Sequence, residues 1–146
     1  DVLDVIAAHD VMLGTGHLCF AEVLPLIKAA KEKGIKRLYQ NHPEFIINET
    51  MEEQVELAKM GVYIEHLAIF MYPMRPTKAG IDGVVQMIRA VGPERTVLAT
   101  DLGQVHNPPP HEGMRMYLQV LSEKGVPKEH LRIMVKDNPY YLLNLS

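Results

Sequence analysis

Residues 50–67, TMEEQVELAKMGVYIEHL, contain a helix signal that is followed at once by a strand signal. Thr50 and Glu53 have the spacing of a capping box, which satisfies free backbone amides at the start of a helix. Apolar residues then recur at helical spacing until Gly61, and a glycine just after a helix is a common terminator. Residues 62–67 form an apolar run of strand length. This stretch therefore predicts a helix that leads directly into a buried strand.

The same unit recurs along the chain at intervals of about 30 residues, which is typical of repeated βα units. Four amphipathic segments end at glycines, namely Gly34, Gly61, Gly92 and Gly125. Strands are predicted at residues 2–9, 36–41, 62–67 and 96–101. Alternating strands and helices predict the α/β class, with a parallel sheet covered by helices. After Gly125 the pattern changes to two short helices, which begin near Pro127 and Asn138.

Composition excludes several classes of protein. The 146 residues carry a net charge of −3 and one cysteine, Cys19. The absence of a Lys/Arg-rich run argues against a nucleic-acid partner, and one cysteine cannot build a disulfide framework. No apolar stretch reaches the ~20 residues that span a bilayer, and no secretory leader is evident, so we expect a cytoplasmic protein without a membrane partner. Because the chain begins at Asp1 without a methionine, we expect it to be a fragment.

Metal-binding side chains follow the predicted strands. They are His17, His42, the pair Glu65 and His66, and Asp101. In parallel α/β folds the carboxyl ends of the strands share one edge, where functional groups gather. Two imidazoles and a carboxylate at such an edge suit Zn²⁺ or another borderline divalent ion, with positions left for water. The sequence therefore predicts a catalytic metal site.

Each of these residues also has a simpler interpretation. His17 could bond a loop carbonyl, His42 could be a turn residue held extended by Pro43, and Asp101 could close an Asx turn. His9 competes with His17, because it lies where a strand over residues 2–9 would end. These alternatives stay open at this point.

The motifs Gly16-His17-Leu18, His42-Pro43 and Thr100-Asp101-Leu102-Gly103, followed by Asn-Pro-x-x-Leu-Leu-x-Leu from Asn138, resemble the C-terminal half of amidohydrolase-superfamily barrels. The resemblance implies a (β/α)8 TIM barrel, of which residues 1–146 supply strands five to eight and the C-terminal helices. It also implies one or two divalent metal ions, Zn first and Mn, Fe or Ni as options, with His17, His42 and Asp101 as ligands. Thr15-Gly16-His17-Leu18 with Thr100-Asp101-Leu102-Gly103-Gln104 resembles a little-characterised branch of metal-dependent hydrolases.

The chain departs from this family because it contains no His-x-His motif and no identifiable ligand from a fourth strand. A complete barrel needs about 250 residues, so four strands cannot close one. We therefore expect the missing half, or a second copy of the chain, as a partner.

The resemblance implies hydrolysis of a C–N, C–O or P–O bond in a small molecule, with Asp101 as proton acceptor. Glu65, His66, Arg75 and His106 are the candidate substrate contacts. Strand alternation points Glu65 and His66 to opposite faces, and Glu65 is favoured for the barrel interior. Two alternatives remain: a metal-dependent decarboxylase of the same superfamily, whose acid substrate Arg75 would bind, and a non-catalytic α/β module completed by another chain.

Overall fold

The sheet is parallel throughout. The computed structural model describes residues 1–44, 47–72 and 80–145. Within them, one four-stranded sheet pairs its strands in chain order. The strands are β1 (Leu13–Gly14), β2 (Leu38–Gln40), β3 (Val62–Leu67) and β4 (Thr96–Ala99). The predicted α/β class is confirmed, and three of the predicted strands contain β2, β3 and β4.

Helices connect the strands and continue after the last one. They are α2 (Phe20–Glu32), α3 (Met51–Lys59), α4 (Gly80–Val91), α5 (Pro110–Glu123), α6 (Lys128–Arg132) and α7 (Asn138–Leu142). The remaining turns are the 3₁₀ helices η1 (Ala68–Met71) and η2 (Pro93–Arg95) and the π-helical turn η3 (Ile133–Asp137). The predicted capping box is confirmed, because Glu53 N–H donates to Thr50 Oγ1 at 3.2 Å and Thr50 N–H to the Glu53 carboxylate at 2.7 Å.

The prediction of a strand at residues 2–9 is wrong, because this segment is helix α1 (Val2–His9). Its N-cap is Asp1, whose carboxylate accepts the N–H of Leu3 at 3.2 Å. Leu3, Ile6 and Ala7 have helical spacing and pack against the core beneath the sheet. A short apolar run suits a helix or a buried strand equally, and here the cap and the three-and-four spacing favour the helix. The first strand is β1, four residues further along the chain.

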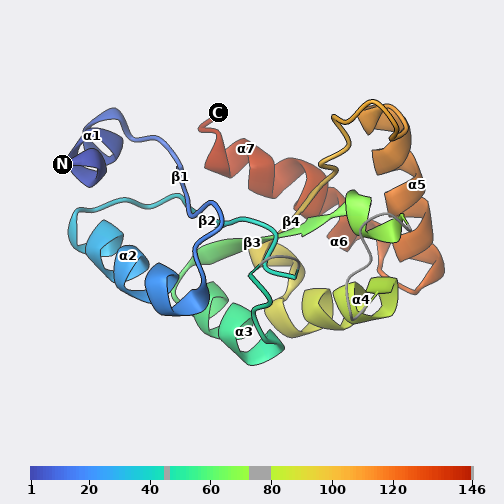
Figure 1. Ribbon diagram of the computed structural model, residues 1–146, viewed down its shortest axis with the longest axis horizontal. Coiled ribbons are helices and arrows are strands. Elements are labelled where there is room, and N and C mark those ends of the chain that lie inside the picture. Colours follow the sequence, from blue (N-terminus) through green and yellow to red (C-terminus); the bar gives the residue numbers. More distant parts are fainter. Residues whose placement is uncertain (45–46, 73–79, 146) are drawn as a thin grey trace.

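The two faces of the sheet are covered differently. Helices α2, α3 and α4 lie along one side, and α7 lies on the other (Figure 1). Side chains alternate along β3, so Val62 and Ile64 join the core under α2 and α3. Tyr63 points the other way, into a small cluster with Tyr39, Val97 and Leu142. His66 follows the alternation of Val62 and Ile64 and thus lies on the side that α2, α3 and α4 cover.

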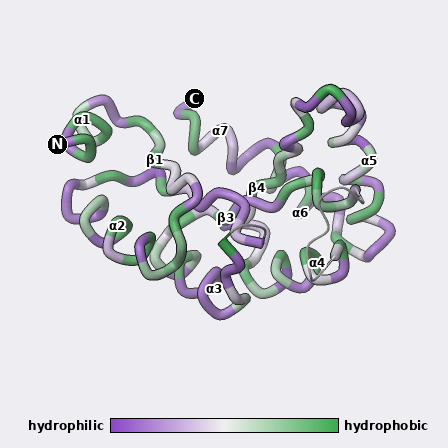
Figure 2. The backbone as a smooth tube through the Cα atoms, in the orientation of Figure 1, coloured by the Kyte–Doolittle hydropathy of each residue, from purple (hydrophilic) through white to green (hydrophobic). Residues whose placement is uncertain are grey.

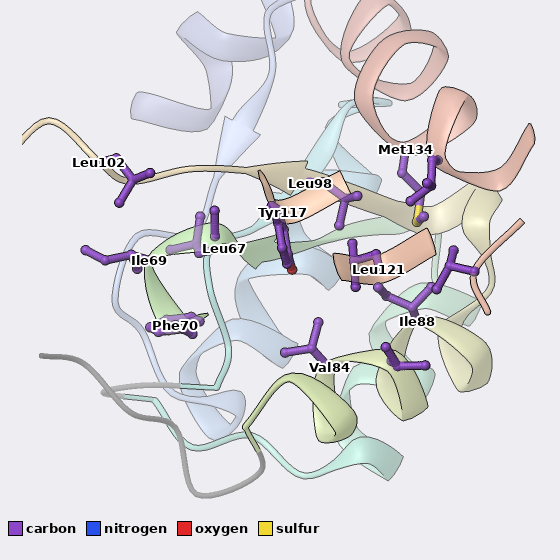
Figure 3. Close-up of a cluster of buried hydrophobic side chains, with 14 residues drawn as sticks. Leu67, Ile69, Phe70, Val84, Ile88, Leu98, Leu102, Tyr117, Leu121 and Met134 are labelled. Carbon is purple, nitrogen blue, oxygen red and sulfur yellow. The ribbon is translucent and has the colours of Figure 1, made fainter. Parts of the chain in front are cut away.

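A second core fills the space between β4 and helices α4 and α5 (Figure 3). The Tyr117 side chain lies among Leu67, Val84, Leu98 and Leu121 and is fully buried. Burial raises the pKa of the Tyr117 hydroxyl, so it stays protonated. In the part of the chain that the structure describes, this hydroxyl has no hydrogen-bond partner. The Tyr117 hydroxyl is therefore a buried polar group without a hydrogen bond among the described residues, which is uncommon in protein cores.

Hydrophobic and hydrophilic residues are interspersed along α2 and α5 (Figure 2), and the buried side chains of α2, namely Val23, Ile27 and Ala30, recur at helical spacing. Among residues 1–44, 47–72 and 80–145, no helix combines the length and hydrophobicity needed to cross a bilayer.

Candidate functional site

The four parallel strands end at one edge of the sheet, and the predicted site residues follow these ends. His17 comes three residues after β1, His42 two residues after β2, and Asp101 two residues after β4. Glu65 lies near the end of β3 itself. His9, the rival of His17, lies in the last turn of α1 and is exposed, so it does not follow a strand.

His17 and His42 meet side by side. Their Nε2 atoms are 3.1 Å apart, and their ring centroids are 4.8 Å apart with 49° between the planes. Zn–N bonds of about 2.0–2.1 Å at a tetrahedral angle would place two ligand nitrogens about 3.3–3.4 Å apart, close to this separation. The pair also satisfies the geometry of a direct hydrogen bond, in which one neutral ring donates to the other. The donor set and its spacing thus fit two of the ligands of a divalent ion.

The loops that carry the two histidines are bonded to each other. Gly16 N–H donates to Asn41 Oδ1 at 3.0 Å, and Asn41 N–H donates to Thr15 Oγ1 at 3.3 Å. Gly16 has a φ of 61°, a conformation that glycine adopts without steric cost. These reciprocal bonds hold the residues just before His17 and His42 together.

Glu65 supports His42 from the neighbouring strand. Its Oε2 accepts the backbone N–H of His42 at 3.0 Å and Nδ2 of Asn41 at 3.4 Å. Its Oε1 accepts the Tyr39 hydroxyl at 2.6 Å. Burial, and next the negative charge of Glu65, raise the pKa of Tyr39, which therefore keeps the proton it donates. The buried carboxylate is thus hydrogen-bonded on both oxygens and orients the loop that follows β2.

His66 lies on the opposite face from Glu65, as strand alternation predicts. It is fully buried, and its Nδ1 shares a hydrogen bond with Oε1 of Glu44. The second carboxylate oxygen of Glu44 and Nε2 of His66 are buried without a partner among the described residues. The structure therefore does not join His66 to the histidine pair.

Asp101 is exposed, and its φ of 50° places a non-glycine residue in the left-handed region. Its carboxylate accepts a hydrogen bond from Nε2 of Gln104 at 3.5 Å. Over the described ranges, no three His, Cys, Asp or Glu side chains form a group that could hold a metal, so Asp101 does not join His17 and His42 in such a group. Left-handed non-glycine residues concentrate at functional sites, which keeps Asp101 a candidate.

The two other predicted substrate contacts are His106 and Arg75. His106 is exposed in the loop after β4. Arg75 lies outside the described residues.

Sequence reasoning missed the residues that hold the site. Tyr39 and Asn41 precede His42, yet neither was predicted to have a role. The signal for Tyr39 is its register position: it pairs with Tyr63, so it shares a face with Glu65. Placing β2 beside β3 would have shown this contact.

Glu49 is a buried carboxyl group in the loop before α3. Its backbone N–H donates to Pro43 O at 2.9 Å, and both carboxylate oxygens are buried without a partner among residues that the structure describes. Burial, followed by the charges of Glu53 and Glu44, raises the pKa of Glu49 to about 8.

Because folded Glu49 keeps its proton after the unfolded chain has lost it, we expect its contribution to stability to fall between pH 4.5 and about pH 8. Glu49→Gln should remove this part of the decline and raise the free energy of unfolding at pH 9 by about 1–2 kcal/mol, allowing for solvent screening. Denaturant unfolding of the wild type and of Glu49→Gln from pH 5 to 9 measures how the free energy of unfolding of each protein changes with pH. Glu56→Gln, on the exposed side of α3, should keep the wild-type slope; equal slopes for wild type and Glu49→Gln would contradict the prediction.

Part of the chain is similar to a known protein family. No curated protein and no solved structure matches the chain. The match is to a family model over residues 1–65, a range that includes His17, His42 and Glu65 and stops before Asp101. Residues 1–65 make up less than half of the chain. Over this range the chain is similar to DUF6282, a family of unknown function.

Proposed function

We propose that this chain belongs to a metal-dependent hydrolase and carries part of its metal site. The observation that supports this most is the 3.1 Å approach of the His17 and His42 Nε2 atoms at the carboxyl edge of a parallel sheet. Edges of this kind carry the active sites of α/β barrels and open sheets. Sequential parallel strands with intervening helices also suit the proposed half of a (β/α)8 barrel.

His17 and His42 would hold the ion through Nε2, and Asp101 is the proposed third ligand. A bound divalent ion would lower the pKa of a water molecule and polarise the bond to be hydrolysed. Asp101 would accept a proton on its carboxylate. Glu65 is the positioning residue, because it fixes the backbone of His42 and the amide of Asn41. The proposed substrate is a small molecule with a C–N, C–O or P–O bond.

Metal content tests this proposal. The chain is purified without chelator, loaded with Zn²⁺, Mn²⁺, Fe²⁺ or Ni²⁺, desalted and measured by elemental analysis and by metal titration. We expect stoichiometric metal in the wild type and a loss of affinity of at least about 100-fold in His17→Ala and in His42→Ala. Asp101→Ala tests the proposed third ligand in the same way.

His111→Ala is the matched control, since the side chain of His111 is 79% exposed on α5. It should retain the wild-type metal content. Metal binding that survives both His17→Ala and His42→Ala, or that is absent from the wild type for all four ions, would overturn the proposal for this chain. In the latter case the 3.1 Å contact is a direct hydrogen bond between the two rings.

A further inference from the structure

A cavity of about 350 Å³ opens at the other edge of the sheet, where the strands begin. Its apolar wall includes Leu38 at the start of β2 and Met60 just before β3. Tyr141 of α7 closes another side. Ligand pockets in proteins begin at about 300 Å³, so the cavity has room for a small organic molecule.

Three cations line this cavity, namely Lys31, Lys36 and Arg95, and none of the described residues that line it is acidic. Lys31 Nζ donates to the backbone oxygen of Met60 at 2.9 Å. Among the ion pairs of the described residues, none involves any of the three cations. The cavity therefore concentrates uncompensated positive charge in a chain whose net charge is −3.

The Arg95 side chain stacks on the Tyr63 ring, which in turn contacts Tyr141. Its guanidinium carbon lies 4.8 Å from the centroid of the Tyr63 ring, and the Tyr63 and Tyr141 rings are 5.6 Å apart. Stacking on an aromatic face orients a guanidinium and leaves its N–H groups free to bind a carboxylate or a phosphate.

Arg37 secures the α7 side of the cavity. Its guanidinium forms two bonds with the Asp10 carboxylate, at 2.6 and 2.8 Å, and donates through Nε to Tyr141 O at 3.2 Å. The charge of Arg37 is thereby neutralised by Asp10, and its contact with the backbone fixes the position of Tyr141. The side of the cavity that Tyr141 forms is thus anchored before any ligand arrives.

We propose that this cavity binds a small organic anion with an apolar body and one carboxylate or phosphate group. Arg95 and Lys36 bind the anionic group, while Leu38, Met60 and Tyr141 contact the apolar body. The site lies at the opposite edge of the sheet from His17 and His42, so it is independent of the proposed hydrolase function.

Titration of the chain at low ionic strength with benzoate, phenyl phosphate and neutral benzamide tests the proposal. Isothermal calorimetry and amide chemical shifts report binding. We expect saturable binding of at least one of the two anions, and benzamide should bind at least about tenfold more weakly than that anion. The stronger of the two anions identifies whether a carboxylate or a phosphate is preferred.

Arg95→Gln and Lys36→Gln should each weaken anion binding by about tenfold. Lys36 is exposed, so Lys36→Gln keeps the test valid even if Arg95→Gln fails to fold. Lys128 is an exposed lysine of α6, so the Lys128→Gln variant should bind the anions like the wild type. His42→Ala should also bind the anions like the wild type, because His42 lies at the opposite edge of the sheet. If the anions bound at the histidine pair instead, this variant would lose affinity for them.

Three results would overturn the proposal: saturable binding of neither anion, equal binding of benzamide, or a loss in His42→Ala or Lys128→Gln as large as that in Lys36→Gln. Because metal is absent from this assay, failure here leaves the proposed hydrolase site untouched, and failure of metal binding leaves this cavity untouched.

Discussion

Glu44→Leu and His66→Leu should each lower the free energy of unfolding by about 3–5 kcal/mol, while the double variant should lose far less than the sum. The Glu44 carboxylate and the His66 ring are buried against each other, with exposed fractions of 2% and 0% for the two side chains. Either single change leaves the other polar group buried without its partner. The double change replaces both groups by apolar side chains, so that neither leaves a buried polar partner behind.

Urea unfolding of the four proteins measures the coupling free energy between Glu44 and His66. Glu56→Leu is the control for a glutamate on an exposed helix position, and it should change stability by about 0.5 kcal/mol or less. Additive losses in the double variant, or single losses below about 1 kcal/mol, would show that the pair contributes no specific coupling.

Glu65→Ala should cost about 3 kcal/mol of stability and, if the proposed function holds, about 10- to 100-fold in metal affinity. The change leaves the Tyr39 hydroxyl and the His42 backbone N–H without their acceptor. It also frees the loop that carries His42. Metal titration and denaturant unfolding of the same protein report the two effects separately.

Glu65→Gln is the conservative control for this prediction. Its amide oxygen can accept from His42 N–H, and its NH₂ group can donate to a rotated Tyr39 hydroxyl. We therefore expect Glu65→Gln to restore most of the metal affinity that Glu65→Ala loses. If both variants lose affinity equally, Glu65 acts through its charge and not by positioning His42. If neither loses affinity, Glu65 has no role in holding the pair.

Local patterns predicted most of the helices, because amphipathic spacing, a capping box and terminal glycines act within one turn of the chain. Residues 62–67 were also predicted correctly, since their apolar run has the length of a buried strand. The error at residues 2–9 has the same origin. A run of apolar residues reports burial, but burial alone does not distinguish a helix from a strand, and the Asp1 cap decides for the helix.

The sequence by itself determined the α/β class, the parallel sheet and the position of His42 after a strand, because these follow from periodicity and chain order, whereas the strand that precedes His17 was placed wrongly at residues 2–9. It also determined that Glu65 and His66 face opposite ways, because side chains alternate along a strand. Only the tertiary structure decided that the His17 and His42 nitrogens meet at 3.1 Å and that Glu65 bonds the loop behind them. The physical reason is that such contacts depend on which strands are neighbours and in what register, and no local pattern encodes either.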